Sequence, residues 1–401
     1  MAQERGAPDN ANLALLASAA FFAGAALRVC DALLPRFAQD FGLGTGAAGV
    51  VIIGFSLAYG FLQLAFGPLG DHYGKLQIIT VAMFGCAAAA AASALSGTFA
   101  TLAASRIAWG VAGAGVIPLA MAHIGDSVPY SRRQATLARF LTGTLTGMVA
   151  GQLMGGLFAD SSLGWRGAFV LLMAGYLGVG GLLALQLRRA RGLAVVAPPA
   201  TMAPARPALL SQLKLVVGTP WARTVLLAVL VEGVFLLGSM AFVPAYLHGR
   251  FGLSLAAASA LTALYAVGGL VYALTAAHLI RRLGERRMAQ CGGWLMGAGF
   301  TAWILLPQWG WSAPIALAVG FGTYLFHNTL QTHATQMVPS ARGTAVSLFA
   351  FALFSGQALG VMSAGAVIDR WGYWPWFSVA AVAMLLAGLM FARAIHKHAP
   401  T

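Results

Sequence analysis

The feature that most constrains this chain is a series of apolar runs, each about 20 residues long and separated by short polar segments. A helix of about that length crosses the roughly 30 Å of bilayer hydrocarbon. Inside lipid only helices and closed barrels satisfy the backbone, and these runs are longer than barrel strands and do not alternate. We therefore predict an all-α polytopic membrane protein. The twelve expected spans are residues 12–35, 47–66, 76–96, 99–122, 135–158, 167–187, 222–246, 254–279, 288–307, 311–336, 343–364 and 374–394.

Composition excludes a soluble protein. Only 8% of the 401 residues are charged, against 59% hydrophobic, whereas soluble domains average about 25% charged residues. The three cysteines, Cys30, Cys86 and Cys291, all lie in apolar runs. An odd number of cysteines buried in lipid argues against a disulfide framework, and we expect them to be packing residues.

The placement of Lys and Arg predicts the orientation. With a cytoplasmic N-terminus, 18 of the 24 basic residues fall in inner loops and tails, 4 in outer loops and 2 inside spans. Because basic residues accumulate on the cytoplasmic side, both termini are expected there. This bias explains the net charge of +14 without a nucleic-acid partner. The N-terminus lacks the positive segment of a secretory signal, so the first span is expected to be uncleaved.

A linker is predicted between spans 6 and 7. Residues 188–220 hold the four prolines Pro198, Pro199, Pro204 and Pro207, and Pro220 at the end, together with alanines and basic residues. Such a composition is typical of a flexible connection. The chain is thereby divided into an N-terminal six-helix bundle, 1–187, a cytoplasmic linker, 188–220, and a C-terminal six-helix bundle, 221–401.

The two halves are related by an internal repeat. Phe41-Gly42-Leu43 recurs as Phe251-Gly252-Leu253, 210 residues later, and Gly74 recurs as Gly284 at the same offset. Val128-Pro129 matches Val338-Pro339, and Asp160 matches Asp369 at 209. Several separated blocks in one register indicate a tandem duplication.

A shorter motif repeats within the halves. Gly67-Pro-Leu-Gly-Asp71 follows span 2, Gly156-Leu-Phe-Ala-Asp160 follows span 5 and Gly365-Ala-Val-Ile-Asp369 follows span 11. Three-helix units related in this way face opposite membrane sides. Inverted repeats of this kind are common in transporters that expose one site alternately to the two sides.

The loop after span 2 resembles that of the major facilitator superfamily. Gly67 to Lys75 is similar to the family pattern glycine-x-leucine-x-aspartate-arginine-x-glycine-arginine/lysine, with His72 in place of the arginine. The resemblance implies the family fold of two pseudo-symmetric six-helix bundles. It also implies that Gly67, Asp71, Gly74 and Lys75 form a cytoplasmic latch between the halves. The alternative is a tight turn between two spans.

Two further segments carry the resemblance. Leu102 to Gly110, in span 4, looks like the family's buried-arginine motif around Arg106. Span 5 is similar to the glycine motif of the drug/proton antiporter branch, with Gln152 where that branch has proline. The alternative is close helix packing through small residues at four-residue spacing. The residues of this motif are Gly143, Gly147, Gly151, Gln152, Gly155 and Gly156.

Ionisable residues inside spans cost roughly 2.5–3.5 kcal/mol each on insertion scales and are therefore functional candidates. Those that lie well inside the spans, away from their ends, are Arg28, Asp31, Arg106, Glu232 and His327, on spans 1, 4, 7 and 10. The resemblance implies that these four spans line a central cavity. Arg28 and Asp31 share a helix face, so they form either a neutralising pair or a substrate or proton site.

Glu232 is the preferred proton carrier, with Asp31 as the second candidate. It lies about ten residues, or about 15 Å, into span 7, and no basic residue lies within two turns on its own helix. Burial then favours the neutral, protonated carboxyl. The alternatives are a site for a cationic substrate and a neutral structural acid.

Span 10 carries a polar stripe. Thr323, His327 and Gln331 follow one another at four-residue spacing, with Asn328 beside them. We expect these four residues to line the substrate cavity together with Arg28, Arg106 and Gln152.

These observations predict a secondary active transporter. The sequence has no Walker-type phosphate-binding loop and no zinc-ligand spacing, and no nucleophile–histidine–acid set falls in a water-facing region, so we expect no ATP, metal, cofactor or enzymatic reaction. The first hypothesis is proton-coupled efflux, by antiport, of a small organic solute across the inner (plasma) membrane by a monomer. The alternatives are proton-coupled uptake of an organic anion and a non-transporting scaffold or receptor.

Overall fold

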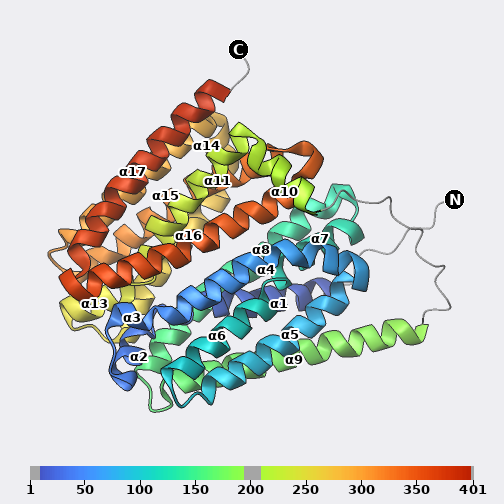
Figure 1. The fold of residues 1–401 in the computed structure, drawn as a ribbon, viewed down its shortest axis with the longest axis horizontal. Helices are drawn as coiled ribbons and strands as arrows, with labels where there is room; N and C mark the ends of the chain where they lie inside the picture. Colours follow the sequence, from blue (N-terminus) through green and yellow to red (C-terminus); the bar gives the residue numbers. More distant parts are fainter. Residues whose placement is uncertain (1–9, 194–208, 399–401) are drawn as a thin grey trace.

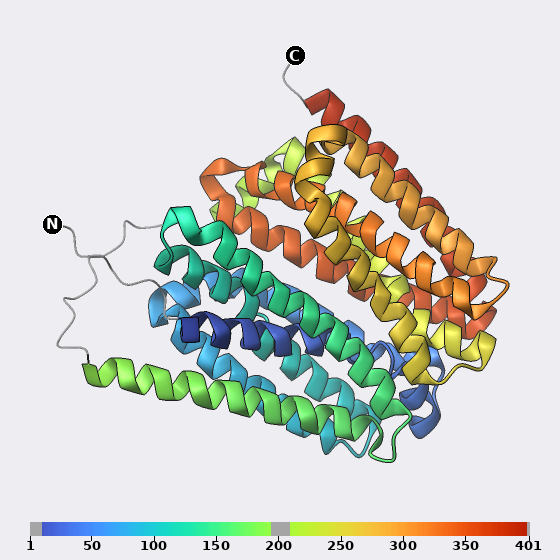
Figure 2. The ribbon, with the colours of Figure 1, turned by 180° about the vertical axis from the view of Figure 1, so that it is seen from behind.

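The computed structural model describes residues 10–193 and 209–398, which are helical almost throughout. Figures 1 and 2 show two bundles side by side, α1 to α9 in one and α10 to α17 in the other. The first contains α1 (Asn10–Arg28), α2 (Leu34–Phe41), α3 (Thr45–Ala48), α4 (Val50–Tyr73), α5 (Lys75–Ala94), α6 (Phe99–Gly113), α7 (Val116–Ser127), α8 (Tyr130–Ala159) and α9 (Gly164–Leu193). The predicted all-α fold with two helical bundles is confirmed.

The second bundle begins after the linker. It contains α10 (Leu209–Gly218), α11 (Pro220–Glu232), the π-helix η1 (Gly233–Leu237), α12 (Gly238–Met240), α13 (Val243–Phe251), α14 (Leu255–Ile304), the 3₁₀ turn η2 (Trp309–Trp311), α15 (Ser312–Gln336), the 3₁₀ turn η3 (Pro339–Ala341), α16 (Arg342–Trp371) and α17 (Tyr373–His398). Figure 1 shows that the bundles converge near α3 and α13 and spread toward the end that holds both termini.

The chain is a multi-pass membrane protein. In the described part of the chain, 8 helical segments are long and apolar enough to cross a membrane. One of them, α14, bends at Gly284 and covers two predicted spans. Three predicted spans, 1, 5 and 10, are not among these eight segments. They are nevertheless helical, since α1 and α2 cover span 1, α8 covers span 5 and α15 covers span 10. Helices therefore occupy all twelve predicted segments, and the count of twelve crossings stays a prediction.

The repeat is visible in the backbone. Glycines with positive φ, which other residues rarely adopt, end or join helices at equivalent places in the two bundles. The pairs are Gly42 (φ 65°) with Gly252 (65°), Gly74 (90°) with Gly284 (67°), and Gly164 (57°) with Gly372 (77°). The first two are pairs that the sequence repeat matched, which explains why glycine recurs there.

Close packing of α1 on α8 explains the glycines of span 5. A Cβ atom on Gly143 would lie 2.5 Å from the carbonyl oxygen of Ala17. Cβ atoms on Gly147, Gly151 and Gly155 would clash still harder with the carbonyls of Phe21, Ala25 and Val29. Four glycines at four-residue spacing thus bring the two backbones together, which supports the packing interpretation.

Gly147→Ala is expected to destabilise the protein, because the added methyl group would overlap the Phe21 carbonyl and force α1 away from α8. Overpacking of this kind costs about 1–3 kcal/mol. Thermal unfolding of the purified protein measures the loss. The control is Gly178→Ala on α9, where a Cβ meets nothing within 4 Å. Equal melting temperatures for the two variants would contradict the packing argument.

Three spans that hold ionisable residues are interrupted. In span 1, helix α1 ends at Arg28, and residues 29–33 form turns before α2 begins. In span 4, which holds Arg106, helix α6 ends at Gly113 and α7 begins at Val116. In span 7, α11 ends at Glu232 and continues as a π-helix. π-helical turns are frequent at functional sites.

The predicted linker, 188–220, is helical at both ends. Helix α9 runs on to Leu193, and α10 covers Leu209–Gly218. Thr344 of α16 donates a 2.6 Å hydrogen bond to Gln212, which attaches α10 to the second bundle. Residues 194–208, with the four prolines, lie outside the described residues.

Candidate functional site

Arg28 and Asp31 form a buried ion pair at the interruption of span 1. Arg28 Nη1 lies 2.9 Å from Asp31 Oδ2, and the two residues are only 6% and 0% exposed. The turn brings them together, since the Asp31 N–H donates to the Arg28 carbonyl at 3.2 Å. The second carboxylate oxygen of Asp31 has no partner among the described residues. A buried polar atom of this kind costs free energy unless something binds to it.

Gln152 of α8 extends this cluster toward the second bundle. It is buried, and its side-chain nitrogen has no partner within the described ranges. Gln152 and Arg28 line a cavity of about 20 Å³ together with Thr262 and Tyr265 of α14. Its size suits about one water molecule. The Arg28 guanidinium lies 5.9 Å from the centre of the Tyr265 ring, so the cluster spans both bundles.

Arg106 packs into the first bundle. Its guanidinium lies 4.2 Å from the centre of the Phe55 ring and 4.9 Å from that of Trp109. Its Nη2 donates a 3.1 Å hydrogen bond to the carbonyl of Ala26. The last carbonyls of a helix lack partners within it, so Arg106 satisfies one of them where α1 ends. These contacts hold α1 in place, while the buried Nε and Nη1 of Arg106 have no hydrogen-bond partner among the described residues, and the role of Arg106 in lining the cavity stays a prediction.

Glu232 and His327 form the second buried pair. Glu232 Oε2 lies 2.9 Å from His327 Nδ1, which joins α11 to α15. The Glu232 side chain is 1% exposed and that of His327 22%. No basic residue lies within two turns of Glu232 on its own helix. Its basic partner, His327, lies on a neighbouring helix, and the sequence alone does not show that contact. The hydrogen bond requires a proton on one of these two atoms.

The rest of the polar stripe on α15 points to several partners. Asn328 donates a 2.9 Å hydrogen bond to the Tyr272 hydroxyl on α14. Thr323 donates to the Val319 carbonyl on its own helix, and Gln331 is exposed. Of the four residues predicted on this face, His327 is the one that pairs with Glu232, while Thr323 also lies in hydrogen-bond contact with Tyr265.

The latch region is described in part. Lys75 Nζ lies 2.7 Å from Asp126 Oδ2 on α7, a partner in its own bundle. Gly74 forms the turn between α4 and α5 with a φ of 90°. Gly67 and Asp71 lie outside the residues whose side chains are described.

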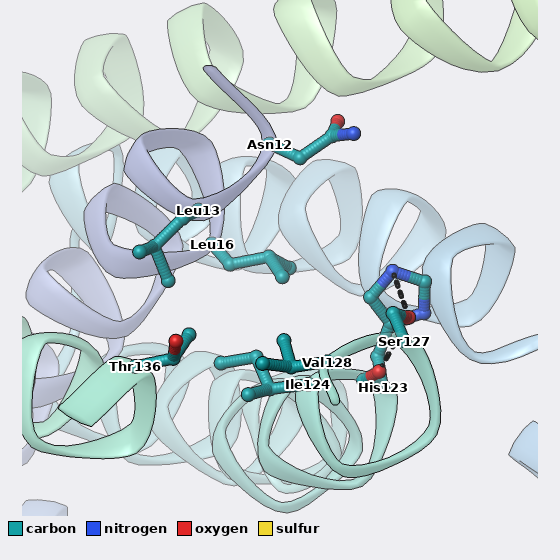
Figure 3. Close-up of a pocket in the computed structure, with 8 residues that line it drawn as sticks. All are labelled: Asn12, Leu13, Leu16, His123, Ile124, Ser127, Val128 and Thr136. Atoms are coloured by element: carbon teal, nitrogen blue, oxygen red, sulfur yellow. Dashed lines mark hydrogen bonds between the residues drawn. The ribbon is translucent and has the colours of Figure 1, made fainter. Parts of the chain in front are cut away.

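A larger cavity lies away from the paired charges. It measures about 140 Å³ and lies between α1, α7 and α8. Figure 3 shows its lining residues, which are Asn12, Leu13, Leu16, His123, Ile124, Ser127, Val128 and Thr136. Since neither ion pair borders it, this cavity is separate from the candidate site.

Some residues of the candidate site have no chemistry that marks them in the sequence. Thr262, Met148 and Met240 line the small cavity, and nothing about residues of these types marks them as lining residues. The described residues contain no group of three or more His, Cys, Asp or Glu side chains that could hold a metal. Cys30 and Cys86 are buried free thiols and Cys291 is a half-buried one.

Comparisons with known proteins match this architecture. The sequence profile of the Major Facilitator Superfamily matches residues 16–361 and 225–401. The uncharacterized MFS-type transporter YceJ of Bacillus subtilis is 22% identical over 355 residues, which cover 88% of this chain and 87% of YceJ. A chloramphenicol resistance protein of Streptomyces lividans is 29% identical over 157 residues, covering 39% of this chain and 40% of that protein.

Solved structures share the fold. The crystal structure of a D-xylose-proton symporter superposes with a TM-score of 0.77, covering 97% of each chain at 14% sequence identity. The two bundles, the loop motif and the family match agree over nearly the whole chain. The chain therefore belongs to the major facilitator superfamily.

Proposed function

We propose that this protein is a secondary active transporter that moves a small organic solute by alternating access, driven by protons in the efflux direction. The observation that carries the proposal is the buried Glu232–His327 pair, at 2.9 Å, on two helices of one bundle. Buried ionisable residues in spans are costly and are retained where they serve transport.

Glu232 is proposed as the proton carrier. Its carboxyl is enclosed, while the imidazole that it contacts is partly exposed. We propose that a proton passes between the surroundings and the carboxyl through the imidazole of His327, since histidine is a residue type that serves as a proton shuttle. Asp31 is the second candidate for the proton carrier. Its direct partner, Arg28, keeps its charge at all times and so, unlike His327, cannot pass a proton on.

Efflux is proposed because one relative is a chloramphenicol resistance protein and because span 5 resembles the antiporter motif. Proton-coupled uptake of an organic anion is the second candidate. It is favoured by the cationic Arg28, which borders the cavity between the bundles. Substrate-cavity roles are proposed for the seven residues Arg28, Arg106, Gln152, Thr323, His327, Asn328 and Gln331.

Flux measurements with purified protein in liposomes test the proposal. A pH gradient is imposed in either direction, and a panel of drug-like compounds and organic anions is followed. We expect solute movement against the proton flow, which signifies antiport. Movement with the proton flow would favour anion uptake. Absence of flux for every compound, in a stable protein, would favour a scaffold or receptor.

We further propose that the protein is a monomer of the inner membrane and that both its termini lie in the cytoplasm. The orientation is supported by the 18 basic residues assigned to one side of the membrane against 4 on the other. Single cysteines at the exposed positions Trp371 and His396, in a background without the three native cysteines, test the orientation. An impermeant thiol reagent added outside whole cells is expected to label the first and spare the second. The reverse pattern would invert the topology.

A further inference from the structure

Four arginines gather at the bend of α14, beside the end of α17 (Figures 1 and 2). All four are exposed, two on each side of Gly284: Arg281, Arg282, Arg286 and Arg287. No carboxylate among the described residues pairs with any of them. The one acid in the segment, Glu285, contacts His333 of α15 instead, at 3.2 Å. The bend therefore presents a group of unpaired positive charges, which we call the arginine cluster.

The sequence repeat makes this cluster distinctive, because the matching loop of the first bundle lacks it. At the offset of 210, the positions of the four arginines correspond to Asp71, His72, Leu76 and Gln77. The first loop holds one lysine and one aspartate, whereas the second holds four arginines and one glutamate. A bias of basic residues toward one side of the membrane is met by charges spread over many loops. It does not explain why they concentrate in one of two matching loops.

The face of α14 that leads to the cluster is apolar and open. Leu270 and Leu274 are 47% and 80% exposed. His278 and Arg281 continue the same helix face, because each follows at a spacing of three or four residues. Exposed leucines on a membrane protein contact acyl chains, which are as apolar as leucine itself. Because predicted span 8 ends at residue 279, the cluster lies where the hydrocarbon gives way to the headgroups.

Phosphate is the group that such a cluster recognises well. The planar guanidinium of arginine donates two parallel hydrogen bonds to phosphate oxygens. An anionic phospholipid carries a phosphate and acyl chains in one molecule, so it matches both the cluster and the leucines. A soluble phosphate matches the cluster alone. The exposed Arg393 and Lys397, near the end of α17, add positive charge at the same end of the bundle (Figures 1 and 2).

We infer that the arginine cluster binds the headgroup of an anionic phospholipid of the adjoining leaflet, with the acyl chains along Leu270 and Leu274. The headgroup neutralises arginines on both sides of Gly284, which otherwise repel one another, and so joins the ends of predicted spans 8 and 9. The site shares no residue with the Glu232–His327 pair. It does not depend on the proposed function, because a lipid binds whether or not the protein transports a solute.

Native mass spectrometry of the purified protein with added phosphatidylglycerol or phosphatidylcholine tests the inference. The wild type is expected to prefer the anionic phosphatidylglycerol, and to prefer it less as the ammonium acetate concentration is raised, because salt screens exposed charges. Each basic residue near a membrane surface strengthens such binding about fivefold. Arg281→Gln should therefore lower the affinity about fivefold, and substitution of all four arginines by glutamine more than about a hundredfold. The single variant decides the question if the quadruple variant does not fold.

The matched control replaces four exposed arginines of the first bundle by glutamine: Arg132, Arg139, Arg188 and Arg189. They are assigned to the same side of the membrane and carry the same charge, but they are spread over α8 and α9. This control is expected to keep the preference for phosphatidylglycerol. An equal loss in the two quadruple variants, or equal binding of the two lipids by the wild type, would overturn the inference. Glycerol 1-phosphate, which has the charge but no acyl chains, should not displace the lipid at equal concentration, and displacement would refute the assignment to a lipid.

Discussion

Glu232→Gln is expected to reduce pH-driven flux to the background of empty liposomes while substrate binding survives. Glutamine has the same shape and can still accept a hydrogen bond from His327 Nδ1, which lies 2.9 Å from the carboxylate in the wild type. It cannot take up or release a proton. The Arg28 cluster lies on other helices and stays intact. Flux under an imposed pH gradient and ligand-induced thermal shift measure the two properties separately.

Glu285→Gln provides the matched control. Glu285 also contacts a histidine, with its Oε2 3.2 Å from His333 Nε2, but its side chain is 46% exposed. Because this pair is exposed, water can supply and remove its protons, and proton-coupled transport does not depend on it. The Glu285→Gln variant should therefore transport normally. His327→Gln should be impaired, because it removes the imidazole through which the proton is proposed to pass. Normal pH-driven flux in Glu232→Gln would refute the assignment of Glu232.

Asp31→Leu is expected to lower stability by about 3–5 kcal/mol, because it leaves the Arg28 charge buried without its partner. Arg28 is 6% exposed and Asp31 is its ion-pair partner at 2.9 Å. A large drop in the melting temperature and in the yield of monodisperse protein should follow. A melting temperature equal to that of the wild type would show that Arg28 finds another partner.

The double variant Arg28→Met with Asp31→Leu separates the two interpretations of this pair. Removing both charges is expected to restore most of the stability, since apolar replacements of buried ion pairs are often neutral or better. If the pair only neutralises itself, flux returns with stability. If it contacts substrate or protons, flux stays absent in a stable protein, which is the result that we expect.

The sequence by itself determined the helical architecture. A bilayer leaves no water for unpaired backbone groups, so long apolar runs have to become helices wherever they lie. The turns between them were equally predictable at Gly74 and Gly284, because only glycine adopts their positive φ at little cost. These properties depend on a residue and its near neighbours in the chain.

The tertiary structure alone decided which side chains meet. Glu232 and His327 are 95 residues apart, and Arg106 bonds to a carbonyl 80 residues away. The glycines of span 5 pack on α1, and Asp369 caps a helix 323 residues before it. Hydropathy shows that a residue is buried but carries no information on what faces it. Those contacts depend on how helices that are distant in the chain pack together, and this packing cannot be read from the order of residues in one sequence.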